Sequence, residues 1–153
     1  MANTFLSDAE VAFLAGLVDR DVKFMVVGMA AAVVQGSDRG TEDVDLWFAS
    51  RSDPGIDAAA RSAGGSFAWR ANPPMIVGKD LNNIDIVYKC SGLGSFEEEY
   101  EDAVEAELGG VRLKILPLAR VIASKTAANR PKDKAALPSL RAALVALKAS
   151  VKR

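Results

Sequence analysis

The chain has 153 residues, half of them hydrophobic and a quarter charged, so we expect residues 1–153 to form one domain with no room for a second large one. The absence of histidine excludes the commonest general base and the commonest zinc ligand, and the single cysteine, Cys90, excludes an internal disulfide. The net charge is −1, yet residues 96–110 carry seven acids and no base, whereas residues 111–153 carry eleven bases and one acid.

This charge asymmetry has two interpretations. The basic C-terminal segment could face phosphate groups or a nucleic-acid backbone. The alternative is that the two segments form solvated helix faces, or that they pair with each other within the fold or across a homodimer.

A membrane protein is not expected. The longest apolar stretch, residues 24–34, has 11 residues, whereas a spanning helix needs about 20. Residues 1–8 lack the basic and then apolar regions of a secretory signal, so the expected location is the cytoplasm.

Hydrophobic periodicity and turn residues predict helices and strands along the whole chain. The mixture of hairpins and crossovers favours an α/β or α+β fold, with a mixed central sheet flanked by helices. In chain order we predict a helix from the Ser7–Glu10 capping box to about Asp19, a strand over 23–27, a helix over 29–35, a strand over 43–48, a helix over 53–64, strands over 67–69, 75–77 and 84–88, an acidic helix over 96–103, a hairpin turning at Gly109–Gly110 into a strand over 111–116, and a C-terminal helical segment over about 117–150 with a break at 129–131.

Asp43 and Asp45 are two residues apart on a predicted strand whose Val44, Leu46 and Phe48 should face the core. Residues two apart on a strand point to the same face, so both carboxylates can bind the same ion. Such hard oxygen ligands suit Mg²⁺ or Mn²⁺, especially where substrate phosphates complete the shell. An Asp-x-Asp pair alone also fits ordinary solvated surface.

The segment before this strand supports a functional role for the Asp43 and Asp45 pair. A predicted strand ends at Gly28 and a helix follows, whose free N-terminal amides would attract phosphate at the same sheet edge. Gly28 by itself also fits a tight strand-to-helix turn that binds nothing.

These residues resemble a known signature. Val27-Gly28-Met29, thirteen residues, and then Asp43-Val44-Asp45-Leu46 resembles the motif of the DNA polymerase β-like nucleotidyltransferase superfamily. The segment from Gly28 to Asp45 is similar to small bacterial members, including AbiEii-type toxins. Ile84-Asp85-Ile86-Val87 resembles the strand with the third carboxylate, and Ile122–Lys125 with Arg130-Pro131-Lys132-Asp133 resembles the C-terminal helical motif, so the similarity covers about residues 24–145.

The resemblance implies a nucleotidyltransferase fold and a role for each matching residue. Asp43 and Asp45 would be metal ligands, and Asp85 would be the third carboxylate and the base for the acceptor. Gly28 would let backbone amides approach the triphosphate, and Met29 stands in the same turn where the motif usually has glycine or serine.

Arg39 and Lys125 are candidate phosphate contacts. Arg39 lies in the loop before the metal strand, where a solvated arginine is the alternative. The resemblance places Lys125 beside the site.

Four other residues have structural interpretations. Lys132 and Asp133 fit a local ion pair at a helix start. Trp47 and Trp69 fit core or rim positions better than base-stacking platforms. Cys90 fits a small buried residue, because no histidine is present to activate it.

The leading functional hypothesis is a Mg²⁺- or Mn²⁺-dependent nucleotidyltransferase. It would move a nucleoside monophosphate from a nucleoside triphosphate, expected to be ATP, to a hydroxyl of a tRNA end, a protein or a small molecule. The alternative is a catalytically silent module of the same fold, such as one component of a toxin–antitoxin pair bound to an antitoxin-like partner. Met29 favours this alternative, since its side chain could crowd the phosphate-binding turn.

Overall fold

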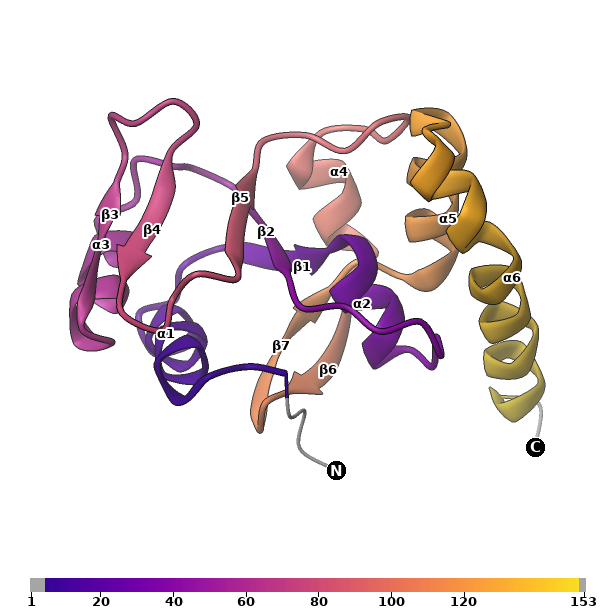
Figure 1. Ribbon diagram of the computed structural model, residues 1–153, viewed down its shortest axis with the longest axis horizontal. Coiled ribbons are helices and arrows are strands. Elements are labelled where there is room, and N and C mark those ends of the chain that lie inside the picture. Colours follow the sequence, from indigo (N-terminus) through magenta and orange to yellow (C-terminus); the bar gives the residue numbers. More distant parts are fainter. Residues whose placement is uncertain (1–4, 152–153) are drawn as a thin grey trace.

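The central sheet has five strands in the order β5-β2-β1-β7-β6 in the computed structural model, which describes residues 5–151 (Figure 1). β1 runs antiparallel to β2 and parallel to β7, while β2 runs parallel to β5. β6 and β7 form the predicted hairpin, and β3 and β4 form a separate one. The strands are β1 (Phe24–Val27), β2 (Val44–Phe48), β3 (Gly65–Ala68), β4 (Met75–Gly78), β5 (Ile84–Val87), β6 (Val104–Leu108) and β7 (Val111–Ile115).

Six helices surround the sheets within the described range. In Figure 1, α3 and the β3–β4 hairpin lie at one end of the molecule, and α5 and α6 lie at the other. The mixed α/β class predicted from the sequence is therefore confirmed. The helices are α1 (Asp8–Asp19), α2 (Gly28–Val34), α3 (Pro54–Ser62), α4 (Phe96–Glu101), α5 (Leu118–Ala128) and α6 (Pro131–Val151).

The first helix begins at the predicted capping box. The Ser7 hydroxyl accepts from the Glu10 backbone N–H, and the Glu10 carboxylate accepts from the Ser7 backbone N–H. Glu10 also accepts from the backbone N–H of Asn83, 2.9 Å away, and its side chain is buried. One carboxylate thus satisfies the start of α1 and ties that helix to the residues just before β5.

β2 is covered on both faces, which corrects the expected strand with one buried face. Val44, Leu46 and Phe48 are buried as predicted, but Trp47 on the opposite face is only 2% exposed. Its ring packs edge-on against Phe96 of α4, and its indole Nε1 donates to the Tyr88 carbonyl oxygen. A strand between two neighbours has both faces available for packing, and here α4 covers the second.

The C-terminal helices break where the sequence predicts. Asn129 takes a left-handed conformation with φ 54° and ends α5, and α6 begins at Pro131. Gln35 at the end of α2 fixes their position, because its side chain donates to the Leu116 carbonyl and accepts from the Leu118 backbone N–H. The start of α5 is therefore held against α2.

The acidic and basic segments pair in part within the fold. Arg120 of α5 and Glu99 of α4 form a two-bonded pair at 2.9 and 2.7 Å, and Arg112 lies 3.7 Å from Glu105 across the β6–β7 hairpin. Residues 1–4, part of the segment from which the location was predicted, and residues 152–153 of the basic segment lie outside the described range.

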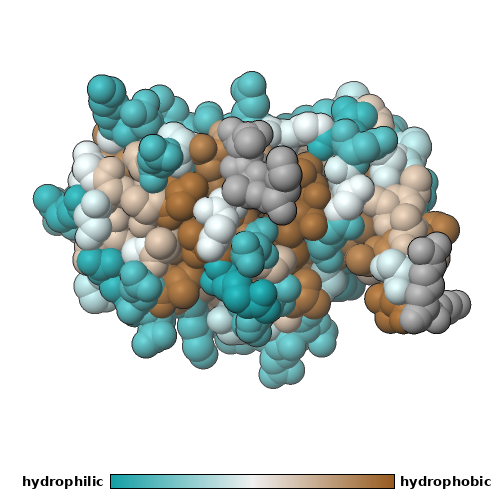
Figure 2. Space-filling model, turned by 90° about the horizontal axis from the view of Figure 1, so that it is seen from below, coloured by the Kyte–Doolittle hydropathy of each residue, from teal (hydrophilic) through white to brown (hydrophobic). Residues whose placement is uncertain are grey.

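The apolar residues of α6 cover the helix unevenly. Leu137 and Leu140 are buried, Leu144 and Leu147 are half-buried, and Val145 is 69% exposed. Figure 2 shows apolar side chains at the surface near the end of the molecule that α6 forms. Val145 therefore lies off the packed face of α6.

No helix between residues 5 and 151 is both long enough and apolar enough to cross a membrane.

Candidate active site

The ends of three strands, β1, β2 and β5, meet at one side of the central sheet. Val27 at the end of β1 pairs with Asp45 near the start of β2, and Asp45 pairs in turn with Asp85 near the start of β5. Paired residues on neighbouring strands point to the same face, so the Asp45 and Asp85 carboxylates lie side by side. Asp43 precedes β2 by one residue.

The three aspartates line one cavity of ≈ 290 Å³ together with Met29 and Arg39. Asp43 and Asp85 are exposed, whereas Asp45 is half-buried. The structure therefore brings together the three carboxylates predicted from two separate segments of the chain.

Burial and then the charge of a neighbouring carboxylate make Asp45 and Asp85 harder to ionise. Burial and then the Asp85 charge raise the pKa of Asp45 above its usual value, against the lowering effect of Lys125 and Lys132. Burial and then the Asp43 charge raise the pKa of Asp85. A bound cation would relieve this repulsion.

The turn at Gly28 leaves no room for a side chain. Its φ is +65°, a left-handed conformation, and a Cβ built on it would lie 2.6 Å from Oδ2 of Asp45. Glycine is therefore required at this position for two independent reasons, the backbone conformation and the approach of a carboxylate. The helix that follows, α2, spans seven residues.

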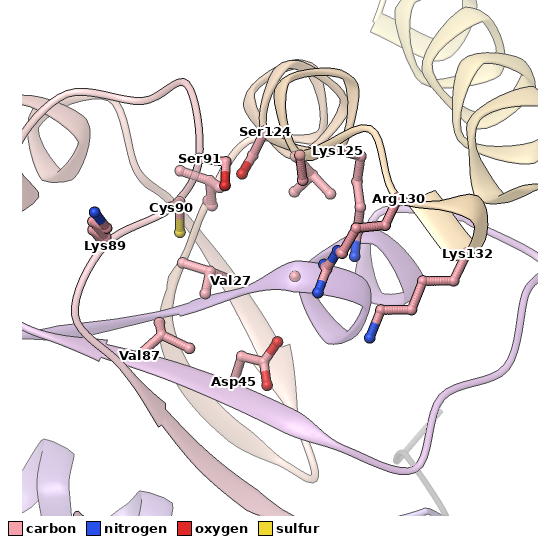
Figure 3. A pocket seen from close by; sticks show the side chains of 14 residues that line it. Val27, Asp45, Val87, Lys89, Cys90, Ser91, Ser124, Lys125, Arg130 and Lys132 are labelled. Atoms are coloured by element: carbon pink, nitrogen blue, oxygen red, sulfur yellow. The ribbon is translucent and has the colours of Figure 1, made fainter. Parts of the chain in front are cut away.

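A second cavity of ≈ 470 Å³ adjoins the first and is lined by basic residues. It shares Asp45, Lys125 and Lys132 with the acidic cavity and adds Lys89 and Arg130. In Figure 3 the side chains of Lys125, Arg130 and Lys132 come from the C-terminal helical side and point into the cavity toward Asp45. One cleft thus combines a carboxylate end with a cationic end.

Asp133 orders two of these cations. It is fully buried, accepts from Nε and the backbone N–H of Arg130 at 2.7 and 3.1 Å, and lies 3.3 Å from Nζ of Lys125. The hydrogen bond from Arg130 lowers the pKa of Asp133 to about 2. The predicted local pair between Lys132 and Asp133 is wrong, because Asp133 pairs with Arg130 and Lys125, and Lys132 faces the cleft.

The candidate phosphate contacts have structural partners as well. Arg39 lines the acidic cavity, but its guanidinium donates to the Ala135 carbonyl oxygen at 3.1 Å and so connects the loop before β2 to α6. Lys125 lies in both cavities while it pairs with Asp133. Met29 is half-buried beside the aspartates.

Residue-by-residue reasoning missed several cleft residues. Lys89 and Arg130 were given no role, and Lys132 was interpreted as part of a local pair, although all three line the basic cavity. The signal that could have found two of them is the Arg130-Pro131-Lys132-Asp133 motif, since it follows a helix break and turns basic side chains back on the sheet.

The structure also shows the positions of Cys90 and Trp69. Cys90 is half-buried rather than buried, and burial raises the pKa of its thiol to about 11, so it is a poor nucleophile in this cleft. Of the two positions predicted for the tryptophans, core or rim, Trp69 takes the rim, because β3 ends at Ala68 and the Trp69 side chain is 59% exposed at the wall of a cavity.

The donor set fits a divalent cation only with help from a substrate. Within residues 5–151, no three acidic or cysteine side chains form a group that could hold a metal ion by themselves. Mg²⁺ is commonly held by one or two carboxylates, with phosphate oxygens and water completing the shell. Asp45 with Asp43 or Asp85, next to a cationic cavity of ≈ 470 Å³, suits that mode of binding.

Comparisons with known proteins agree with this architecture. No protein-family model matches the sequence, and no curated protein matches it. Among solved structures, a crystal structure of the aminoglycoside nucleotidyltransferase ANT(2″)-Ia in complex with adenylyl-2″-tobramycin is similar with a TM-score of 0.59 and 17% identity, over 92% of this chain and 88% of that one.

A solution structure of the antibiotic-resistance factor ANT(2″)-Ia is similar with a TM-score of 0.60 and 16% identity, over 93% of this chain and 84% of that one. At this level of identity the similarity concerns the fold, and it extends over nearly the whole chain. The chain therefore has the nucleotidyltransferase fold.

Proposed function

We propose that this chain is a metal-dependent nucleotidyltransferase, which moves a nucleoside monophosphate from a nucleoside triphosphate to an acceptor hydroxyl. The single observation that carries the proposal is the composition of the cleft. Asp45 belongs both to a cavity lined by Asp43 and Asp85 and to a cavity lined by basic side chains. Nucleotidyl transfer needs both ends, one for divalent cations and one for a polyphosphate.

The basic cavity would hold the triphosphate, with ATP as the expected donor. Lys125, Arg130 and Lys132 approach from the helices and would neutralise the phosphate charge. Gly28 also lines this cavity and has no side chain, so the backbone of the turn can approach a phosphate closely.

The acidic cavity would bind the cation and activate the acceptor. Asp43 and Asp45 would be the metal ligands, joined by Asp85 or by phosphate oxygens. When bound, Mg²⁺ or Mn²⁺ supplies positive charge that stabilises the leaving and attacking oxygens.

The proposed transfer forms one bond to phosphorus and breaks another. The acceptor hydroxyl oxygen forms a bond to the α-phosphorus, the bond between that phosphorus and the bridging oxygen to the β-phosphate breaks, and pyrophosphate leaves. Asp85 takes the hydroxyl proton, a role supported by its exposed position in the acidic cavity and by its raised pKa.

A transfer assay with α-phosphate-labelled nucleotides tests the proposal. Each of the four triphosphates is incubated with the chain, Mg²⁺ and an acceptor set comprising tobramycin, total RNA and cell protein. Tobramycin is included because ANT(2″)-Ia was crystallised with its adenylyl form. We expect a labelled product with wild type and none with Asp45→Asn or Asp85→Asn. Transfer that is undiminished in Asp45→Asn would refute the assignment.

A second candidate is the catalytically silent module, favoured by Met29 beside the aspartates in the acidic cavity. Such a module could be part of a toxin–antitoxin pair or a homodimer. Calorimetric titration with ATP and Mg²⁺ separates the two hypotheses. Metal-dependent binding that requires Asp43, Asp45 and Asp85 favours the enzyme, and no binding at millimolar nucleotide favours the silent module.

A further inference from the structure

A third cavity, of ≈ 690 Å³, lies away from Asp43, Asp45 and Asp85, between α3, the loop that joins β3 to β4, and the end of β5. In Figure 1 the β3–β4 loop stands next to the end of β5 on the same side of the molecule. The proposed cation and triphosphate sites do not include this cavity.

Two exposed aromatic side chains line it. Trp69 is 59% exposed and Tyr88 is 45% exposed, although large aromatic side chains usually lie inside a fold. Tyr88 does not need its ring for the fold, because only its backbone carbonyl accepts the Trp47 indole N–H. Each ring is therefore partly open to solvent at the wall of the cavity.

An arginine lies over each of these rings. The guanidinium carbon of Arg51 is 4.8 Å from the Tyr88 ring centroid, and that of Arg70 is 4.7 Å from the Trp69 ring centroid. Neither arginine forms an ion pair with a carboxylate in the part of the chain that the structure describes. Both remain available for an anionic ligand.

The acidic side chains of the cavity are already bonded within the fold. Asp53 accepts from the Gly55 backbone N–H at the start of α3. Asp57 accepts from the Phe67 backbone N–H and pairs with Arg61 at 2.6 Å. The groups left for a ligand are thus aromatic faces and guanidinium groups, a combination that binds stacked bases and the phosphates between them.

The cavity is connected to the cleft through consecutive residues. Tyr88 lines this cavity, and the next three residues, Lys89, Cys90 and Ser91, line the basic cavity of the cleft. Tyr88 follows Asp85 by three residues, which is about 10 Å of extended strand. Tyr88 therefore borders the basic cavity of the cleft, a few residues along the chain from Asp85.

We infer that Trp69, Tyr88, Arg51 and Arg70 form a platform for single-stranded nucleic acid, on which an RNA strand stacks its bases and directs its terminal hydroxyl toward Asp85. The inference that this strand is the acceptor rests on the proposed nucleotidyl transfer. Binding of the strand does not, so it is measured without catalysis.

The test uses a fluorescein-labelled, mixed-sequence RNA of about ten nucleotides, with anisotropy in low salt as the readout. Trp69→Ala and Tyr88→Ala are each expected to weaken binding on the order of tenfold. Trp69→Phe should retain most of the affinity. Met75→Ala is the matched control, because Met75 is 45% exposed on the same hairpin but does not line the cavity, and it should bind as wild type does.

Tryptophan emission gives a second readout. The chain has two tryptophans, and Trp47 is buried. RNA should quench wild-type emission, and Trp69→Phe should remove the quenching while anisotropy still reports binding.

Nucleotide binding is measured separately, so that the two proposals fail independently. Asp45→Asn should lose Mg²⁺-dependent ATP binding and keep RNA binding. Trp69→Ala should keep Mg²⁺-dependent ATP binding and bind RNA more weakly. The platform assignment is overturned by absence of wild-type RNA binding at millimolar strand, by equal affinity of Trp69→Ala and Met75→Ala, or by displacement of the RNA by an equal concentration of free AMP. Transfer of label to a ribonuclease-resistant protein acceptor would also overturn it.

Discussion

At the scale of single residues, the environment of Asp45 disfavours its ionised form. Asp45 is held half-buried between Asp43 and Asp85, and burial together with their charges raises its pKa. A carboxyl group whose folded-state pKa is raised contributes its full stabilisation below the unfolded pKa, near 3.8, and this contribution is lost as the pH rises through the folded pKa. At neutral pH without a cation, the ionised group therefore destabilises the fold.

Asp45→Asn should consequently be more stable than wild type at pH 7 in a chelator, by on the order of 1 kcal/mol. Added Mg²⁺ should reduce the difference in stability between Asp45→Asn and wild type, since the cation stabilises only wild type. Thermal unfolding measures both effects. Asp38→Asn is the control, because Asp38 is exposed and lines neither cavity of the cleft. Equal melting temperatures for Asp45→Asn and wild type in the chelator would contradict the repulsion described here.

Substitution of Gly28 should affect both stability and nucleotide binding, and Gly36 provides the matched control. Gly28→Ala should lose about 1 kcal/mol of stability from the left-handed backbone and should also displace the Asp45 carboxylate, which lowers affinity for ATP with Mg²⁺. Gly36→Ala meets a similar backbone penalty at φ +109°, but its Cβ would have no atom within 4 Å. It should therefore lose stability and keep its affinity. Calorimetry on both variants makes the comparison, and equal affinities would show that crowding of Asp45 has no effect on binding.

At the scale of elements, the corner between α5 and α6 positions the basic side chains. Asn129 ends α5 in a left-handed conformation, and Asp133 in the first turn of α6 accepts from Arg130 and pairs with Lys125 of α5. A single buried carboxylate thus joins two helices and directs two cations toward the cleft. Its own negative charge stabilises a cluster of like charges that would otherwise repel one another.

Asp133→Asn should destabilise the chain by about 2 kcal/mol near neutral pH, the equivalent of a carboxyl pKa lowered from 3.8 to about 2. Because the folded pKa is depressed, this contribution is complete above about pH 4 and is lost as the pH falls through about 2. In urea unfolding between pH 6 and pH 2, the free energy of unfolding of wild type should therefore exceed that of Asp133→Asn by less as the pH falls. Glu101→Gln, an exposed acid on α4, is the control, and an advantage that is independent of pH would exclude the ionic mechanism.

At the scale of the whole molecule, the cleft lies between the sheet edge and the C-terminal helices, so a ligand that spans it should stabilise the fold. ATP with Mg²⁺ at a hundredfold excess over its dissociation constant should contribute about 2.7 kcal/mol. ATP or Mg²⁺ alone should contribute much less, because the carboxylates and the triphosphate need each other's counter-charges. Differential scanning fluorimetry compares the three conditions, and a shift with ATP that is unaffected by chelator would argue against a metal-bound nucleotide.

The sequence by itself determined the order of elements and the identity of the carboxylates. The Ser7–Glu10 capping box, the glycine turns and the alternation in β2 are local signals, and the helices and strands follow them closely. Asp43 and Asp45 could be named because residues two apart on a predicted strand share a face, and Asp85 because its strand resembles the one with the third carboxylate in the nucleotidyltransferase superfamily. Local physics, such as capping, turn conformation and period, acts over a few residues and is therefore readable from them.

Only the tertiary structure decided which distant residues meet. The burial of Trp47 depends on α4 crossing the second face of β2. The pairing of Asp133 with Lys125 instead of Lys132 depends on how separate segments pack. The same holds for the cavity that Trp69 and Tyr88 line together. Long-range contacts reflect the sum of many weak packing and electrostatic terms over the whole chain, and no window of neighbouring residues contains that sum.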